Sequence, residues 1–172
     1  ELKEKVSSIL CLKDDLVVDV LCTVYVSHFV QGDPVWLMMV GAPSSGKTEL
    51  LHGLSTAPGI HLLSNITPNT LISGWSKDKS GPYTKVKDDS LLFRIEGQIL
   101  VMKDFTTVLQ MRPDSRAEVV GQLREIYDGR YSKEFGTKQG VYWEGKLGFV
   151  AGVTPAIYKH TGFIGQMGER FI

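Results

Sequence analysis

The chain has 172 residues, of which 42% are hydrophobic and 22% are charged. This balance predicts one globular domain with a hydrophobic core, because disordered chains carry fewer apolar residues and more net charge. Lys plus Arg equals Asp plus Glu at 19 each, which excludes a global basic field that would attract nucleic acid or an anionic membrane. Any such binding must therefore be local or must arise by assembly.

The cysteines, the histidines and the apolar stretches exclude several other classes. Cys11 and Cys22 have neither CxxC spacing nor a companion histidine cluster, and the four histidines are scattered, so no zinc site or disulfide framework is indicated. The longest apolar stretch, 16–30, is interrupted by Asp19 and is shorter than the roughly 20 apolar residues of a membrane span. We expect a soluble cytoplasmic protein with no membrane partner.

Residues 1–33 are expected to form an N-terminal helical segment. Leu2, Val6 and Ile9 recur at helical spacing, and a second apolar segment runs to Val30. A turn rich in polar and turn-forming residues follows. The segment therefore consists of two helices that precede the rest of the domain.

The next elements alternate between strands and helices. A short apolar run at 35–40, bounded by Pro34 and Gly41, is typical of a strand buried on both faces of a parallel sheet. This alternation predicts an α/β fold with a mostly parallel sheet. Further buried strands, separated by helical segments, are expected at 60–66, 98–102 and 147–153.

Two other segments carry recognisable patterns. Ser115 followed by Glu118 is a capping-box pattern, which predicts a helix that begins there and ends near Asp128. The segment 73–90 is polar and rich in turn formers, which is typical of a surface loop.

The strongest motif begins where the strand at 35–40 ends. Residues 41–48 read Gly-Ala-Pro-Ser-Ser-Gly-Lys-Thr, which matches the phosphate-binding pattern GxxxxGK[ST] between a strand and a helix. Glycines allow the backbone N–H groups to face phosphates at a helix N-terminus whose dipole favours anions. The residues expected to bind the nucleotide are Gly41, Ala42, Pro43, Ser44, Ser45, Gly46, Lys47, Thr48 and Glu49.

This motif assigns roles to individual side chains. Lys47 is expected to contact the β and γ phosphates of ATP, and Thr48 to ligate Mg²⁺. A neighbouring strand must supply an acidic metal ligand, for which Asp104 is the best candidate. Phe105 stands where the usual catalytic Glu would follow, so the catalytic base is not identified. The alternative interpretation of Asp104 is an N-cap carboxylate before Thr106.

The order of these motifs resembles that of the AAA+ ATPases, and within them the clade of viral superfamily 3 and minichromosome-maintenance helicases. The resemblance spans about 35–171, nearly the whole chain, and implies a P-loop three-layer α/β/α ATPase core at 34–172. The segment 147–155 resembles the sensor 1 strand, which implies that Thr154, in place of the usual Asn, contacts the γ-phosphate or the attacking water. The segment 168–171 resembles the one that carries the arginine finger. This implies that the guanidinium of Arg170 reaches the γ-phosphate bound by a neighbouring subunit. A structural ion pair is the alternative for Arg170.

The same resemblance implies an assembly and a substrate. It implies a homo-oligomeric ring, such as a hexamer, and the segment 130–143 resembles the hairpin that these helicases project into their pore. Lys133, Phe135 and Lys138 are then expected to contact single-stranded DNA, since charges suit phosphates and rings suit bases. An exposed hairpin without nucleic-acid contacts is the alternative. In the family a helical lid follows the fifth core strand, so this chain is expected to lack the lid.

Three functions remain open on the sequence alone. The first is a ring-forming, ATP-driven DNA motor, such as a helicase or replication protein of a phage or mobile element. The second is a P-loop kinase in which the segment 73–90 closes over a small acceptor. The third is an ATP-gated interaction switch with little hydrolysis, which the missing Glu after Asp104 favours.

Overall fold

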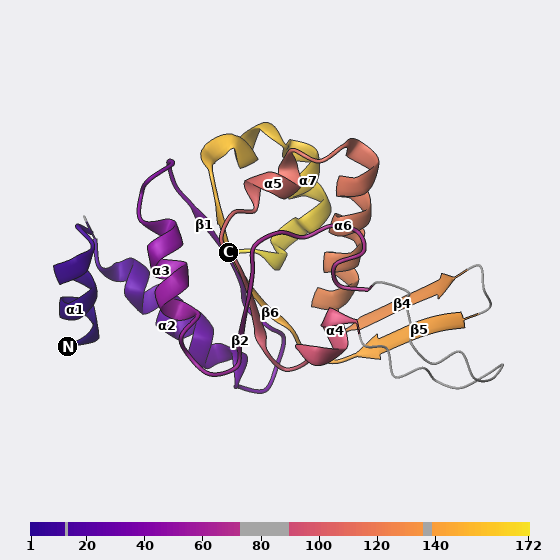
Figure 1. Cartoon of the computed structure of the whole chain (residues 1–172), viewed down its shortest axis with the longest axis horizontal. Helices are drawn as coiled ribbons and strands as arrows, with labels where there is room; N and C mark the ends of the chain where they lie inside the picture. The colour runs from indigo at the N-terminus through magenta and orange to yellow at the C-terminus, as the bar shows by residue number, and fades with distance from the viewer. Residues whose placement is uncertain (13, 73–89, 136–138) are drawn as a thin grey trace.

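The structure, a computed structural model, describes residues 1–12, 14–72, 90–135 and 139–172 (Figure 1). The expected surface loop at 73–90, except for Ser90, and Lys138 lie outside the described residues. The helices are α1 (Leu2–Ile9), α2 (Leu16–His28), α3 (Lys47–Leu54), α4 (Leu91–Arg94), α5 (Thr106–Leu109), α6 (Pro113–Tyr127) and α7 (Thr161–Met167), with the 3-10 turns η1 (Pro155–Lys159) and η2 (Gly168–Arg170). The strands are β1 (Trp36–Val40), β2 (Ile60–Leu63), β3 (Ile99–Met102), β4 (Arg130–Phe135), β5 (Gln139–Glu144) and β6 (Gly148–Val153).

The main sheet has four strands in the order β1-β6-β3-β2, and all of its pairings are parallel. Val150 in the middle of β6 lies opposite Leu37 of β1 on one side and Val101 of β3 on the other. The mixed α/β class and the parallel sheet expected from the sequence are therefore confirmed. Because the strands are parallel, the chain leaves β1, β3 and β6 at the same edge of the sheet, the upper edge in Figure 1.

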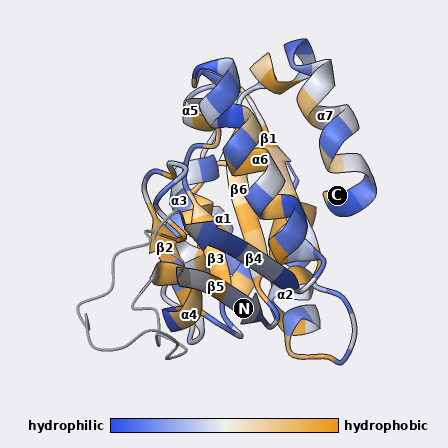
Figure 2. Cartoon of the chain, turned by 90° about the vertical axis from the view of Figure 1, so that its right-hand side faces the viewer, coloured by the Kyte–Doolittle hydropathy of each residue, from blue (hydrophilic) through white to orange (hydrophobic). Residues whose placement is uncertain are grey.

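Helices cover both faces of this sheet, because successive strand side chains point to opposite faces. On one face, α2 and α3 bury Leu21 and Leu51 against alternate strand residues such as Val101. On the other face, α4 to α7 pack on a second cluster that includes Leu100 and Phe149. Figure 2 shows the hydrophobic strands between helices whose outer surfaces are largely hydrophilic.

Strand β1 also pairs with the last two residues of the chain. Phe171 forms a parallel bridge with Trp36, the N–H of Met38 donates to the carbonyl of Ile172 at 2.9 Å, and the N–H of Ile172 donates to the carbonyl of Trp36 at 3.0 Å. The indole N–H of Trp36 donates to the carbonyl of Leu147 at 2.8 Å. Phe171 and Ile172 thus lie beside β1 at the edge of the sheet.

Two boundaries differ from the sequence expectations. Helix α6 begins at Pro113 instead of Ser115, and Arg112 occupies its N-cap with extended backbone angles. Proline is favoured in the first turn because the backbone N–H groups there have no intrahelical partner, so the N–H that proline lacks is not needed. The capping-box prediction is therefore wrong, since Ser115 lies inside the helix. Strand β2 ends at Leu63, three residues earlier than expected.

The hairpin expected at 130–143 is present as an antiparallel pair of strands. Arg130 of β4 lies opposite Glu144 of β5, and Tyr131 lies opposite Trp143. This pair forms a separate sheet that extends away from the parallel one (Figure 1). Helix α6 runs directly into it, since only Asp128 and Gly129 separate α6 from β4. None of the described helices is long and apolar enough to cross a membrane.

Helix α2 is fixed at its end by a buried histidine. His28 is 5% exposed, and its Nε2 lies 3.0 Å from the carbonyl of Gly97, so Nε2 carries the proton. Its Nδ1 is buried and has no hydrogen-bond partner among the described residues. Burial lowers the pKa of His28, the Gly97 carbonyl opposes this shift, and the charge of Lys146 adds to it.

We predict a pH-dependent loss of stability that depends on His28. The folded-state pKa lies below the ordinary 6.5, so protons bind the unfolded chain more tightly. The contribution of His28 is then complete above about pH 6.5 and is lost as the pH falls through the folded-state pKa. Urea midpoints of the wild type should decrease from about pH 8 to about pH 5, and His28→Gln should flatten this decrease. His52→Gln, on the exposed side of α3, should keep the wild-type slope, and an equal slope in His28→Gln would contradict the assignment.

Candidate functional site

The site is built from the loop that joins β1 to α3. Two residues of this loop adopt positive φ angles, Ser44 at 59° and Gly46 at 82°. Gly46 is the N-cap of α3, and this left-handed conformation explains the glycine there. A Cβ at Gly41 would lie 2.8 Å from the Oγ of Ser45 and 3.3 Å from the Cδ of Lys47. The loop therefore folds back on itself so closely that a side chain at its first position would displace the hydroxyl of Ser45.

The ammonium group of Lys47 lies over this loop. It donates to the carbonyls of Gly41 and Ala42, both at 2.7 Å, and to the hydroxyl of Ser45 at 3.2 Å. The first turn of α3 thus projects its lysine back across the strand end. A positive charge is fixed where the loop curls, close to the N-terminal end of the helix.

Backbone donors surround the same position. Within the described part of the chain, the N–H groups of Gly46, Lys47 and Thr48 make no hydrogen bond, and the first helical bond of α3 comes from Leu50 to the carbonyl of Gly46 at 3.1 Å. Free N–H groups at a helix start, together with the helix dipole, bind anions. This donor set fits the phosphates of a nucleotide.

The residues that follow Lys47 suit the metal that accompanies a nucleotide. Thr48 and Glu49 are exposed in the first turn of α3. Hydroxyl and carboxylate oxygens are the ligands that Mg²⁺ prefers, together with phosphate oxygens and water. Among the described residues, no group of three or more His, Cys, Asp or Glu side chains is arranged to hold a metal by itself. Thr48 and Glu49 thus present oxygen atoms of this kind at the start of α3.

Asp104 lies just beyond β3, two strands away from the loop. Its Oδ1 accepts the N–H of Thr106 at 2.9 Å, as the N-cap interpretation expected, although the helix α5 itself begins at Thr106 with Phe105 as its N-cap. The carboxylate is exposed, and its Oδ2 makes no hydrogen bond with another described residue. Asp104 can therefore hold the start of α5 with one oxygen and present the other at the sheet edge.

Phe105 points away from this edge. Its side chain is fully buried (0% exposed), and its ring lies 6.0 Å from that of Phe149 and 5.4 Å from that of Phe163. Its N–H donates to the carbonyl of Gly152 at 2.7 Å. The position after Asp104 belongs to the hydrophobic core and cannot supply a catalytic base.

Thr154 follows β6, which lies between the strand of the loop and the strand of Asp104. The N–H of Gly41 donates to the carbonyl of Val153 at 3.1 Å, so β6 ends beside the start of the loop. The hydroxyl of Thr154 lies 3.3 Å from that of Thr106. The topology thus gathers the loop, Thr154 and Asp104 at one edge of the sheet.

Arg170 lies elsewhere. Its guanidinium binds both carboxylate oxygens of Asp128, at 3.0 and 3.1 Å, and lies 5.5 Å above the ring of Tyr127. The next residue, Phe171, pairs with the first residue of β1, whereas the loop follows the last. Arg170 therefore lies at the opposite edge of the sheet from the loop of its own chain, in the ion pair considered as the alternative.

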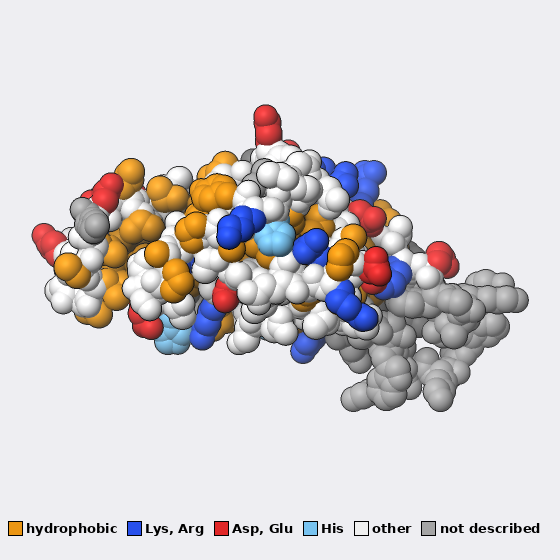
Figure 3. Space-filling model, turned by 90° about the horizontal axis from the view of Figure 1, so that it is seen from above, with side chains coloured by type: hydrophobic (Ala, Val, Ile, Leu, Met, Phe, Trp, Pro, Cys, Tyr) orange, Lys and Arg blue, Asp and Glu red, His pale blue; other side chains and the backbone are white. Residues whose placement is uncertain are grey.

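The hairpin residues are described in part. Lys133 forms an ion pair with Glu118 of α6 at 3.1 Å. Phe135 lies opposite Gln139 at the end of the ladder. Seen from above, the edge with the loop shows scattered Lys, Arg and His side chains among apolar and uncharged ones, without a continuous basic tract (Figure 3).

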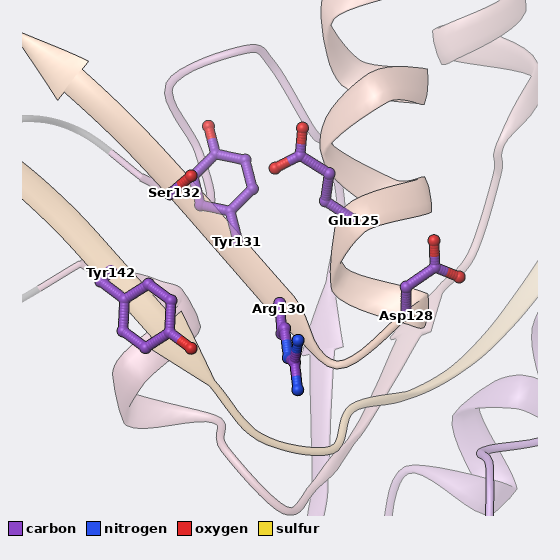
Figure 4. Close-up of a pocket in the computed structure, with 6 residues that line it drawn as sticks. All are labelled: Glu125, Asp128, Arg130, Tyr131, Ser132 and Tyr142. Atoms are coloured by element: carbon purple, nitrogen blue, oxygen red, sulfur yellow. The ribbon is translucent and has the colours of Figure 1, made fainter.

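A hollow of about 480 Å³ lies between α6 and the hairpin, away from the loop. Figure 4 shows Glu125 turned toward Tyr131, whereas Asp128 points away from both. Burial, with the charges of Glu125 and Glu118, raises the pKa of Tyr131 to about 12. The sequence did not indicate this hollow. It indicated Asp128 only as the end of a helix and Thr106 only as the residue that an N-cap carboxylate of Asp104 would precede. The Asp-x-Thr spacing, typical of a side-chain turn, was the signal for Thr106.

No protein-family model matches this chain, and no curated protein matches it.

We predict that a carboxylate cannot be introduced beside Asp104 at position 105. Phe105→Glu removes a fully buried ring and places an unpaired charge in the core, so it should destabilise the chain by about 3–5 kcal/mol. Phe105→Leu should cost about 1–2 kcal/mol. Urea unfolding followed by circular dichroism measures both. A stable Phe105→Glu variant with raised ATP turnover would mean that this side chain faces the site.

Proposed function

We propose that this chain binds ATP with Mg²⁺ and hydrolyses it, as the P-loop three-layer core of an AAA+ ATPase. The observation that carries the proposal is the loop between β1 and α3. Its N–H groups at Gly46, Lys47 and Thr48 are unpaired within the described residues, and the ammonium of Lys47 is held by the carbonyls of Gly41 and Ala42 in the same loop. Few arrangements other than a phosphate site explain a lysine folded onto a glycine-rich helix start.

Each residue at the edge has a role in this proposal. When bound, Mg²⁺ neutralises the charge that develops on the transferred phosphoryl group. The loop N–H groups and Lys47 hold the phosphates, and Thr48 and Asp104 hold the metal. Thr154, at the end of the strand between them, is the residue placed to contact the terminal phosphate or the attacking water. Proximity and fixed charge supply the catalysis in this type of site.

A second candidate function is an ATP-gated switch with little hydrolysis. The burial of Phe105 favours it, because no carboxylate follows Asp104 to activate water. An ATPase would instead need Asp104 itself, or another carboxylate, to activate the water. The two functions share the binding site and differ in turnover.

The proposed motor is a ring that acts on DNA. Arg170 lies at the sheet edge opposite to its own loop, so it can reach a γ-phosphate only in a neighbouring copy. That action requires release of the carboxylate of Asp128. The hairpin of β4 and β5, which carries Lys133 in the middle of β4, is the segment proposed to meet single-stranded DNA. A phage or mobile-element replication protein is the proposed context.

We predict that Lys47→Ala weakens ATP binding and removes turnover. The ammonium is the fixed positive charge of the loop, and its loss should weaken binding of a fluorescent ATP analogue by at least about tenfold, equivalent to a charged hydrogen bond. Asp104→Asn should retain binding and lower turnover, with a changed Mg²⁺ requirement. Lys159→Ala, an exposed lysine on η1, is the matched control and should behave as the wild type.

The products of the reaction separate the remaining functions. Free phosphate supports the ATPase, phosphate on an acceptor supports a kinase, and binding without turnover in any assembly state supports the switch. Wild-type ATP binding that is unchanged in Lys47→Ala would refute the proposed site.

We predict that turnover depends on assembly through Arg170. ATPase activity per chain should rise with protein concentration and with single-stranded DNA, and Arg170→Ala should remove turnover while ATP affinity stays nearly intact. Asp128→Asn is the matched variant, because it breaks the same ion pair but keeps the guanidinium. It should retain turnover. If both variants lower the thermal midpoint equally and leave turnover unchanged, Arg170 is only a structural partner of Asp128.

A further inference from the structure

Thr106 contacts both of the residues proposed to act at the sheet edge. Its backbone N–H donates to Oδ1 of Asp104 at 2.9 Å. Its side-chain Oγ1 accepts the N–H of Thr154 at 3.3 Å and lies 3.3 Å from the hydroxyl of Thr154. One half-buried residue thus connects the end of β3 with the end of β6.

The backbone makes this bridge possible. A Cβ at Gly152 would lie 2.7 Å from the carbonyl of Lys103, so β6 and the segment after β3 approach each other without an intervening side chain. The N–H of Phe105 donates to the carbonyl of Gly152 at 2.7 Å. The buried ring of Phe105 anchors the same turn. A short hydroxyl side chain therefore spans from Thr106 to Thr154.

The hydrogen bond between the two hydroxyls can run in either direction. A threonine hydroxyl has one proton and two acceptor lone pairs. Oγ1 of Thr106 accepts the N–H of Thr154 with one lone pair, and its own proton can be donated to Oγ1 of Thr154. In that direction the proton of the Thr154 hydroxyl is left to donate outward, toward the sheet edge where the loop lies.

We propose that Thr106 is a positioning residue that orients the hydroxyl of Thr154 toward the terminal phosphate of the bound nucleotide. The inference rests on the proposed nucleotide site. The side chain of Thr106 sets the direction of the Thr154 hydroxyl, and its backbone independently holds the carboxylate of Asp104. Because the two contacts use different atoms, substitution of the side chain tests the first without removing the second.

The test compares Thr106→Val, Thr106→Ser and Thr107→Val. Valine keeps the volume and removes the hydroxyl, serine keeps the hydroxyl, and Thr107 is an exposed neighbour whose hydroxyl donates only to the backbone carbonyl of Asp104. Binding of ATP and of ADP is measured by calorimetry, turnover by phosphate release, and folding by the thermal midpoint. Thr106→Ala is measured in the same way if the valine variant melts early.

We expect Thr106→Val to lower the preference for ATP over ADP and the turnover by about tenfold, the value of one hydrogen bond. Its thermal midpoint and its ADP affinity should remain close to those of the wild type. Thr106→Ser should restore both properties, and Thr107→Val should leave both unchanged. When Thr106→Val is combined with Thr154→Val, it should have no further effect, because the Thr154 hydroxyl that Thr106 orients is already absent.

The alternatives give different results. A wild-type preference for ATP in Thr106→Val, or a full additional loss in the double variant, would overturn the inference while leaving the nucleotide site intact. Equal losses in Thr106→Ser and Thr106→Val would also overturn it. If the wild type binds neither ATP nor ADP, the proposed function fails, and the inference fails with it.

Discussion

Strand β6 is hydrogen-bonded to β1 on one side and to β3 on the other, and the geometry of the site depends on this insertion. Without β6, no strand would join β1 to β3, and the loop after β1 and the carboxylate of Asp104 would not be held in fixed positions relative to each other. Because β6 lies between them, its end is held on both sides. On one side the N–H of Gly41 donates to the carbonyl of Val153, and on the other the N–H of Thr154 donates to the hydroxyl oxygen of Thr106. The parallel direction of all three strands then places their carboxyl ends together.

The loop itself combines local and tertiary requirements. The positive φ of Gly46 and the close approach at Gly41 are local and are met by glycine. The position of the loop depends on tertiary packing. Leu51 of α3 is fully buried against the sheet, and this contact fixes the direction of the helix. A rigid helix with a free first turn is the arrangement in which fixed dipoles act on an anion without reorganisation.

Much of this arrangement was predictable because it is local. Strands buried on both faces have continuous apolar runs, and the glycine and lysine spacing of the loop is a short-range pattern. The start of α6 was not, because Ser115 and Pro113 both offer a start signal and the proline prevails. The contacts of Thr106 with Thr154 and of Arg170 with Asp128 join residues 48 and 42 positions apart. Such contacts follow from strand order, which periodicity does not specify.

The position of β1 in the sheet has a consequence for how the chain reaches this structure. In the described residues, its backbone partners are β6 and Phe171–Ile172, all in the last quarter of the chain. During synthesis β2 and β3 can pair early, while β1 and its glycine-rich loop wait for residues 148–153. Such long-range closure is slow and leaves an apolar strand exposed meanwhile. The proposed nucleotide site is therefore expected to be among the last features to form, and ribosome-bound chains that end before residue 148 should lack it.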